Sequence, residues 1–497
     1  MTIRILLMSL IAAAISSPIA AAQSAADRKL NIQRQVHARS QAAFEKEIDK
    51  IIEWCNERGM VEAAKRTRKQ TRHPDPQALT QTPLPREKQA PIPESAIGDE
   101  RLWYGKLSAA RKEHARELYR LSRTVLRQGY PSYALELIQE VAYHDPDHKN
   151  ARRILGFVDF HDKQRQETQY LGEWVTPFEK KMLAKKRIWS DKYGWIPELH
   201  LEKYEQGLRP FKASWITAEK DQQIRRDFRN AWVIETEHFK VKTNYSLERG
   251  VEIAAKLENF YSFFRRTFAT FFETPEEFRN RFTNSKSSRG RMRTPRQMEV
   301  HYFRNKEEYV EKLVRNIQQI AITDGLYYEP DQTSYFYHDP ARETEGTLYH
   351  EATHQFFDIP TIQHRNNAAR QLARRLRTKA TRWKIGERSN FWMVEAIACY
   401  MESFEPSKSG NQLGNPQYER FRAAHFRLTN TEYYVPLRQF SAMGMQQFQT
   451  SPKIAMNYTQ GSGLAHFFMH YEGGRYRDSL VAFIGELYRP DITDPTR

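Results

Sequence analysis

The feature that most constrains the fold is a short segment with two histidines near residue 350. It reads Leu348-Tyr349-His350-Glu351-Ala352-Thr353-His354-Gln355-Phe356-Phe357. In an α-helix, residues four apart lie one above the other on the same face, so His350 and His354 could both reach a single Zn²⁺ ion if this segment is helical. Glu351 would lie one residue further round, where its carboxylate could take a proton from a water molecule that the metal holds. We therefore expect a helix that carries a metal site.

A second predicted helix offers a third ligand. It spans Asn390-Phe391-Trp392-Met393-Val394-Glu395-Ala396-Ile397-Ala398-Cys399-Tyr400-Met401-Glu402. The small residues Ala396 and Ala398 would let this helix pack closely against the first, with Glu395 directed at the metal. Three protein ligands leave a fourth zinc position for water, which is the catalytic arrangement. Glu402 fits two interpretations equally well, a hydrogen bond to a ligand histidine or a solvated side chain.

These motifs resemble those of a known family. The pattern W-x-x-E-A-x-A-x-Y-x-E is similar to the third-ligand helix of the gluzincins, the zinc metallopeptidases with an H-E-x-x-H…E motif that include thermolysin and aminopeptidase N. Ala396 replaces a glycine of that pattern. Tyr458-Thr459-Gln460-Gly461-Ser462-Gly463-Leu464 is similar to their Y-E-K-G segment, in which the tyrosine hydroxyl hydrogen-bonds the oxyanion.

The resemblance covers about residues 240–490 and implies a thermolysin-like domain of the α+β class. It implies that His350, His354 and Glu395 bind zinc and that Glu351 and Tyr458 are catalytic. A purely structural tyrosine is the alternative for Tyr458. The layout looks most like uncharacterised secreted bacterial proteins with a peptidase-like domain of unknown function.

The chain departs from the family pattern in two ways. His354 and Glu395 are 41 residues apart, a much longer gap than in the aminopeptidases. We expect the extra length, residues 361–388, to form an inserted basic helix near the mouth of the site. Its cations are Arg365, Arg370, Arg374, Arg375, Arg377, Lys379, Arg382, Lys384 and Arg388. The G-A-M-E-N motif that anchors a free amine is absent, which favours an endopeptidase over an exopeptidase.

Two further features have competing interpretations. His466 and His470 form another pair four residues apart, but no nearby acid completes a metal site and the aromatic neighbours indicate a packed helix. The strand Ser334–Tyr337 is a candidate sheet edge that a substrate could extend, and an interior hairpin is the alternative.

The N-terminus predicts export. Arg4 precedes a short apolar run, and Ala20-Ala21-Ala22 provides a cleavage site, so residues 1–22 have the order of a signal peptide. An uncleaved anchor or a buried helix is the alternative. No later apolar run is long enough to span a membrane, so we expect a secreted or periplasmic protein with no transmembrane segment after cleavage. The two cysteines, Cys55 and Cys399, are expected to be free thiols.

The remaining sequence divides into five expected regions. They are a helical pair (23–73), a proline-rich linker that resists helix and sheet (74–100), a tetratricopeptide-like helical region (101–168), a small tryptophan-rich β subdomain (169–236) and the gluzincin-like domain (237–497). Apolar residues at helical spacing, among them Phe44, Ile48, Leu118 and Val125, predict the helical cores.

The function that we expect is that of an exported zinc metallopeptidase acting on a polypeptide substrate. A net charge of +17 favours an acidic or envelope-associated substrate. The alternative is a catalytically inactive adaptor of the cell envelope that keeps the peptidase fold, and the helical N-terminal region is where a protein partner would bind. No recognition-helix or zinc-knuckle motif predicts specific nucleic-acid binding.

Overall fold

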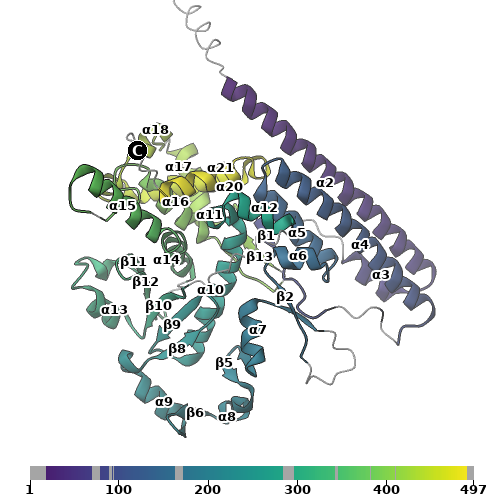
Figure 1. Ribbon diagram of the computed structural model, residues 1–497, viewed down its shortest axis with the longest axis horizontal. Coiled ribbons are helices and arrows are strands. Elements are labelled where there is room, and N and C mark those ends of the chain that lie inside the picture. Colours follow the sequence, from purple (N-terminus) through teal and green to yellow (C-terminus); the bar gives the residue numbers. More distant parts are fainter. Residues whose placement is uncertain are drawn as a thin grey trace, which may run out of the picture. The chain divides into compact units, whose positions relative to one another are not determined.

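The computed structural model describes residues 18–69, 79–88, 92, 95–162, 172–283, 296–341, 345–380, 382–408, 410–431 and 433–489, with side chains from residue 28 onward. The predicted leader, residues 1–22, therefore lies mostly outside the described residues. The chain forms two compact units (Figure 1). Unit 1 contains residues 1–74, 84–155 and 161–174, and unit 2 contains residues 75–83, 156–160 and 175–497.

Unit 1 is built from helices: α2 (Pro18–Glu57), α3 (Val61–Arg68), α4 (Gly98–Arg127), α5 (Pro131–His144) and α6 (Lys149–Ile154). Gly59 separates α2 from α3 at φ +67°, and Gly129 separates α4 from α5 at φ +93°. The apolar residues predicted to form the helical cores are buried, including Phe44, Ile48, Leu118, Val125 and Ile138. The helices predicted in this part of the chain are thus confirmed.

The proline-rich segment contains a strand, which corrects the prediction that it resists both helix and sheet. β1 (Leu79–Gln81) pairs antiparallel with β13 (Asn411–Leu413) within unit 2. The prolines at 76 and 83 flank the strand, so all three strand residues keep the N–H groups that a sheet needs.

The tryptophan-rich region contains short strands, as predicted, and Trp174, Trp189, Trp195 and Trp215 lie on them. The strands are β3 (Glu173–Val175), β4 (Arg187–Ser190) paired with β5 (Gly194–Pro197), and β6 (Leu208–Phe211) paired with β7 (Ser214–Thr217). Strand β2 (Val158–Phe160) and the short helices α7 (Pro177–Ala184), η1 (Glu198–His200), α8 (Leu201–Glu205), α9 (Ala218–Arg225) and η2 (Phe228–Asn230) complete this region.

A five-stranded sheet forms the framework of unit 2. Its order is β11 (Gly325–Tyr328), β12 (Thr333–Tyr337), β10 (Met298–Phe303), β9 (Phe239–Thr243) and β8 (Trp232–Glu235). The three inner strands are parallel, and both outer strands run antiparallel to their neighbours. Of the two interpretations of Ser334–Tyr337, the interior hairpin is confirmed and the sheet edge is wrong, because β12 pairs antiparallel with β11 on one side and parallel with β10 on the other. The free edge beside it is β11.

Helices cover both faces of this sheet. α10 (Leu247–Thr267) and α14 (Glu345–Asp358) share an aromatic core with β9, β10 and β12, whereas α13 (Lys306–Leu313) packs on the opposite face. α10 ends at Thr267 and is followed by α11 (Ala269–Phe272), and α13 ends at Leu313 before η4 (Ile320–Ile322). Helix α12 (Pro275–Thr283) follows α11. Mixed helices and small sheets agree with the α+β class.

The remaining helices follow α14 along the chain. They are α15 (Ile362–Leu376), α16 (Phe391–Met401), α17 (Glu419–Asn430), α18 (Leu437–Ala442), α19 (Met445–Gln449), α20 (Ile454–Gly474) and α21 (Arg477–Tyr488). α16 packs against both α14 and α20. Among the described residues, none of the helices has both the length and the apolar character needed to cross a bilayer.

Candidate metal centre

Helix α14 has one buried face and one that carries the predicted site. Leu348, Ala352 and Phe356, spaced by four residues, are buried in the aromatic core. His350 and His354 occupy another face, and both side chains are partly exposed, at 15% and 17%. The amphipathic pattern of the helix therefore holds the two imidazoles at the boundary between the core and the solvent.

Glu395 on α16 meets both histidines. Its Oε2 atom lies 3.4 Å from Nε2 of His350 and 3.7 Å from Nε2 of His354. Donor atoms about 2.0–2.1 Å from a tetrahedral zinc would be about 3.4 Å apart, so the observed separations come close to those of a zinc site. The three residues form a group whose ligand atoms all lie within 4.8 Å of one another. Two imidazoles and a carboxylate also match the chemical preference of Zn²⁺.

A carboxylate outside this group orients His350. Glu402 Oε1 lies 2.8 Å from His350 Nδ1, which leaves Nε2 free to face Glu395. Arg420 donates to both oxygens of Glu402, with Nε at 2.5 Å and Nη2 at 3.0 Å, and the Tyr418 hydroxyl donates at 3.1 Å. The expected hydrogen bond between Glu402 and His350 is confirmed, and the alternative of a solvated glutamate is wrong.

The charges of the site shift several pKa values. Burial lowers the pKa of His354 and also opposes the charge of His350. For His350 the bonds from Cys399, Glu395 and Glu402 outweigh burial and raise its pKa well above the ordinary value. Burial alone would raise the pKa of Glu395, but the two histidines and Tyr458 lower it. Glu395 is thus held as a carboxylate, the form that binds a metal.

Glu351 faces the edge strand of the sheet. The backbone N–H of Tyr327 on β11 donates to Glu351 Oε2 at 2.7 Å. The Tyr327 hydroxyl donates to Oδ2 of Asp358, the last residue of α14, at 2.6 Å. Residues 351 and 358 are two turns apart on one face, so Tyr327 lies along α14 and ties the edge strand to the helix.

Tyr458 comes to the site from α20. Its phenol makes a hydrogen-bonding contact with the Glu395 carboxylate. Burial, and after it the charge of Glu395, raise the pKa of Tyr458, so the hydroxyl keeps its proton and can donate it in a hydrogen bond. The structure therefore brings together all five predicted site residues: His350, Glu351, His354, Glu395 and Tyr458.

The packing of α16 differs from the prediction in one respect. Ala396 was expected to face the H-E-x-x-H helix, but it faces α20. A Cβ atom added to Gly461 would lie 3.2 Å from the Cβ of Ala396, so both positions need small residues where these helices meet. The preceding residue, Glu395, is turned toward α14, where its carboxylate meets His350 and His354.

The second histidine pair, His466 and His470, contacts a hydroxyl group and a backbone carbonyl and not a carboxylate. His470 Nε2 lies 2.7 Å from the Tyr400 hydroxyl, and His466 Nε2 lies 3.0 Å from the carbonyl oxygen of Gly414. Within the residues that the structure describes, the pair belongs to no group of potential metal ligands. The expectation of a packed helix is confirmed. The two cysteines, Cys55 and Cys399, are free and buried, also as expected.

The extra segment between His354 and Glu395 contains the predicted helix, α15. Most of its basic side chains are exposed, but Arg365 is only 1% exposed and pairs with the buried Asp358. Arg365 also lies 3.5 Å from Glu329 Oε1. Arg365, one of the cations expected on the inserted basic helix, therefore does not face solvent but anchors α15 to the end of α14.

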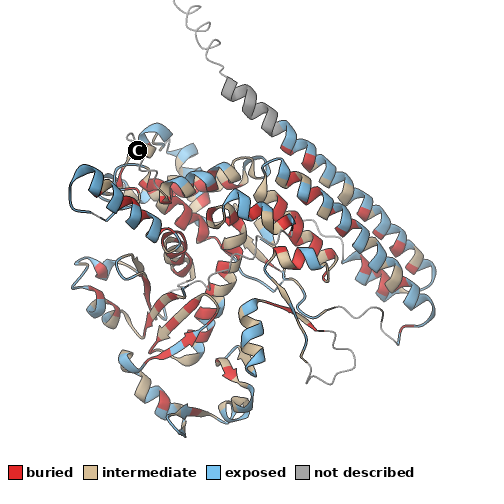
Figure 2. Cartoon of the chain, viewed as in Figure 1, coloured by how far each residue is buried: buried red, intermediate tan, exposed pale blue. Residues whose placement is uncertain are grey.

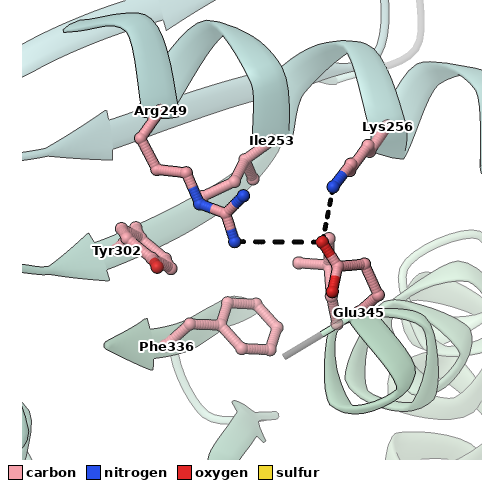
Figure 3. A pocket seen from close by; sticks show the side chains of 7 residues that line it. Arg249, Ile253, Lys256, Tyr302, Phe336 and Glu345 are labelled. Carbon is pink, nitrogen blue, oxygen red and sulfur yellow. Dashed lines mark hydrogen bonds and ion pairs between the residues drawn. The ribbon is translucent and has the colours of Figure 1, made fainter. Parts of the chain in front are cut away.

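A small pocket lies beside the first turn of α14 (Figure 3). Its charged groups are all paired: Glu345 Oε1 lies 2.5 Å from Lys256 Nζ and 4.0 Å from Arg249 Nη2, and Glu252, outside the lining, pairs with both cations at 2.8 Å. None of the predicted site residues lines it. We interpret these ion pairs as the contacts that hold the start of α14 against α10, and we do not interpret the pocket as a ligand site.

Sequence reasoning missed three parts of the site. Arg420 and Tyr418 carry no motif and are separated from Glu402 by a stretch that contains β13, while the contact from Tyr327 uses a backbone N–H that any residue except proline would provide. The arrangement consequently has to be interpreted from its own geometry. No protein-family model matches the chain, and a search of curated proteins finds no significantly similar sequence.

Proposed function

We propose that this protein is an exported zinc-dependent peptidase with a thermolysin-like domain. We propose further that it is an endopeptidase, which cleaves internal peptide bonds of its polypeptide substrate. The observation that carries the proposal is the meeting of His350 Nε2, His354 Nε2 and Glu395 Oε2 at separations suited to zinc. When bound there, Zn²⁺ supplies Lewis-acid polarisation of a carbonyl group and lowers the pKa of a water molecule.

The protein's own residues divide the remaining work. Glu351 Oε2 accepts the N–H of Tyr327, so Oε1 can take a proton from water and deliver it to the leaving amine nitrogen. Tyr458 keeps its proton and can donate a hydrogen bond to the oxygen on which negative charge develops. Glu402 fixes His350 with Nδ1 engaged, so that Nε2 is the nitrogen offered to the metal.

The Glu351→Gln variant tests this proposal. Loss of the carboxylate should lower the rate of peptide hydrolysis by about 10²–10⁴-fold. The zinc content should stay the same, because Glu351 is outside the proposed ligand set. Cleavage of a library of quenched fluorescent peptides and zinc content by mass spectrometry are the two measurements. Glu405→Gln, the same chemical change at an exposed position, is the matched control.

Two results would contradict the proposal. Full activity in Glu351→Gln would show that the hydrolysis does not use this site. A zinc-loaded wild-type protein that cleaves no peptide of the library would instead favour the inactive adaptor, which binds a partner through the same fold without turnover.

A further inference from the structure

The segment after α14 forms a loop with an unusual charge. We call residues 366–380 the basic loop; it holds most of α15 and the turn after it. No Asp or Glu occurs between residues 359 and 386. The exposed cations of the basic loop are Arg370, Arg374, Arg375, Arg377 and Lys379. Figure 2 colours most of the α15 ribbon as exposed.

Both ends of the basic loop are fixed to one carboxylate. On one side Arg365 Nη2 lies 3.5 Å from Glu329 Oε1, and on the other Arg382 Nε lies 3.1 Å from the same oxygen. Arg382 Nη2 also donates to the backbone carbonyl of Glu329 at 2.8 Å. The loop is therefore closed at its base by charge-assisted hydrogen bonds.

This base adjoins the edge of the candidate metal centre. Glu329 directly follows β11, and Tyr327, two residues earlier, donates its N–H to Glu351. The Tyr327 hydroxyl and Arg365 also share Asp358. A polypeptide that extends β11 as a new strand would consequently run past the base of the basic loop.

The cationic side chains of the basic loop repel one another. Arg370 and Arg374 are four residues apart on α15, a spacing at which like charges destabilise a helix. The buried face of α15 consists of Arg365 and the small residues Ala368, Ala369 and Ala373, so the outer cations contribute little to its packing. A negatively charged partner would relieve the repulsion among these side chains.

We propose that the basic loop binds an acidic segment of the polypeptide substrate, displaced along the chain from the bond that is cleaved. From Arg365 to Arg375 the helix rises about 15 Å, which is the length of about five residues of extended chain. The acidic residues would thus lie about five or more residues from the part of the substrate beside β11. This inference rests on the proposed peptidase function, but its binding surface can be tested without hydrolysis.

The test uses the full-length Glu351→Gln protein, which should bind peptides without cleaving them. Two fluorescent peptides are compared by anisotropy, identical except that one has a run of glutamates and the other a run of glutamines. We expect the glutamate peptide to bind at least about tenfold tighter at low salt, with most of the difference lost at about 0.3 M salt. The double variant Arg374→Glu/Arg375→Glu should weaken its binding at least about tenfold.

The matched control reverses two exposed lysines on and beside α7, Lys181→Glu/Lys185→Glu. It changes the net charge of the protein equally, and the affinity for the glutamate peptide should stay within about twofold. Equal weakening in both double variants would overturn the proposal, because the attraction would then belong to the whole protein. Equal affinity for the two peptides would also overturn it.

The same variants separate this inference from its alternatives. Binding of phosphatidylglycerol vesicles through Arg374 and Arg375, without discrimination between the peptides, would assign the loop to a lipid surface and overturn the proposal. Selective binding of the glutamate peptide by a wild-type protein that hydrolyses nothing would support the acidic-peptide surface and contradict the peptidase function alone.

Discussion

Two histidine pairs of unit 2 have the same spacing and opposite surroundings. His350 and His354 lie on α14, His466 and His470 lie on α20, and α16 packs against both helices. The rings of the first pair are 4.9 Å apart and nearly perpendicular, at 75°. Those of the second pair are 4.6 Å apart and stacked at 27°. Spacing alone therefore does not decide what a histidine pair does.

The helix between the pairs makes the difference. From one face α16 supplies the carboxylate of Glu395, and from another it supplies the hydroxyl of Tyr400. The carboxylate faces the Nε2 atoms of both His350 and His354, as a shared cation would require. The hydroxyl engages only His470, and burial lowers the pKa of His470 to about 3. The first pair can thus share a metal, whereas in the second pair His470 stays neutral and packs against its neighbours.

Removing the carboxylate should have the largest effect. In Glu395→Ala we expect the affinity for Zn²⁺ to fall by more than about 100-fold, beyond the loss caused by changes outside the ligand set. The double variant His466→Ala/His470→Ala should keep its zinc affinity within about twofold of the wild type. A chelator-competition titration measures both. If zinc binding followed His466 and His470 instead, our assignment of the two pairs would be reversed.

A smaller effect is expected from the partner of His350. Glu402→Gln keeps the size of the side chain but weakens its bond to Nδ1 of His350, and the affinity for Zn²⁺ should fall about 10–100-fold. The exposed Glu405→Gln should leave it unchanged. The same titration measures this change, with circular dichroism to verify the fold. An unaltered zinc affinity in Glu402→Gln would show that zinc binding does not depend on the orientation of His350 by Glu402.

The sequence predicts these two environments only in part. Helical spacing predicts α14, α16 and the buried aromatic side of each helix, because the period of 3.6 residues is a local property. The aromatic neighbours of His466 also indicate packing correctly. The side of α16 that faces each helix cannot be obtained in this way: Ala396 was expected toward α14 and instead meets Gly461 of α20. That choice depends on complementary surfaces of helices distant in sequence.

The edge of the sheet shows the same limit. Residues 334–337 are recognisable as a strand, but their place inside the sheet depends on the return of β11, which only pairing reveals. Arg365 is another example. Its neighbours in the sequence are polar or basic, whereas its buried partner Asp358 is supplied by the preceding helix. Non-local pairing therefore determines the details of the site that local patterns leave open.

The smallest expected effect is a pH dependence from the packed pair. His470 faces His466 and Arg477, and burial is the first cause of its pKa of about 3. The unfolded chain has the ordinary histidine pKa of about 6.5, so the unfolded state binds more protons as the pH falls below this value. The contribution of His470 to stability is thus fully present above about pH 7.5, and about 1.3 kcal/mol of it should be lost by pH 5.5. Urea unfolding of the zinc-free protein and of its His470→Gln variant at both pH values measures this contribution. The difference between the two proteins isolates the effect of His470 on the free energy of unfolding, because they share every other titrating group. The variant should lose less stability on acidification by about that amount, and an identical pH dependence in the two proteins would show that His470 is not held neutral by its packing.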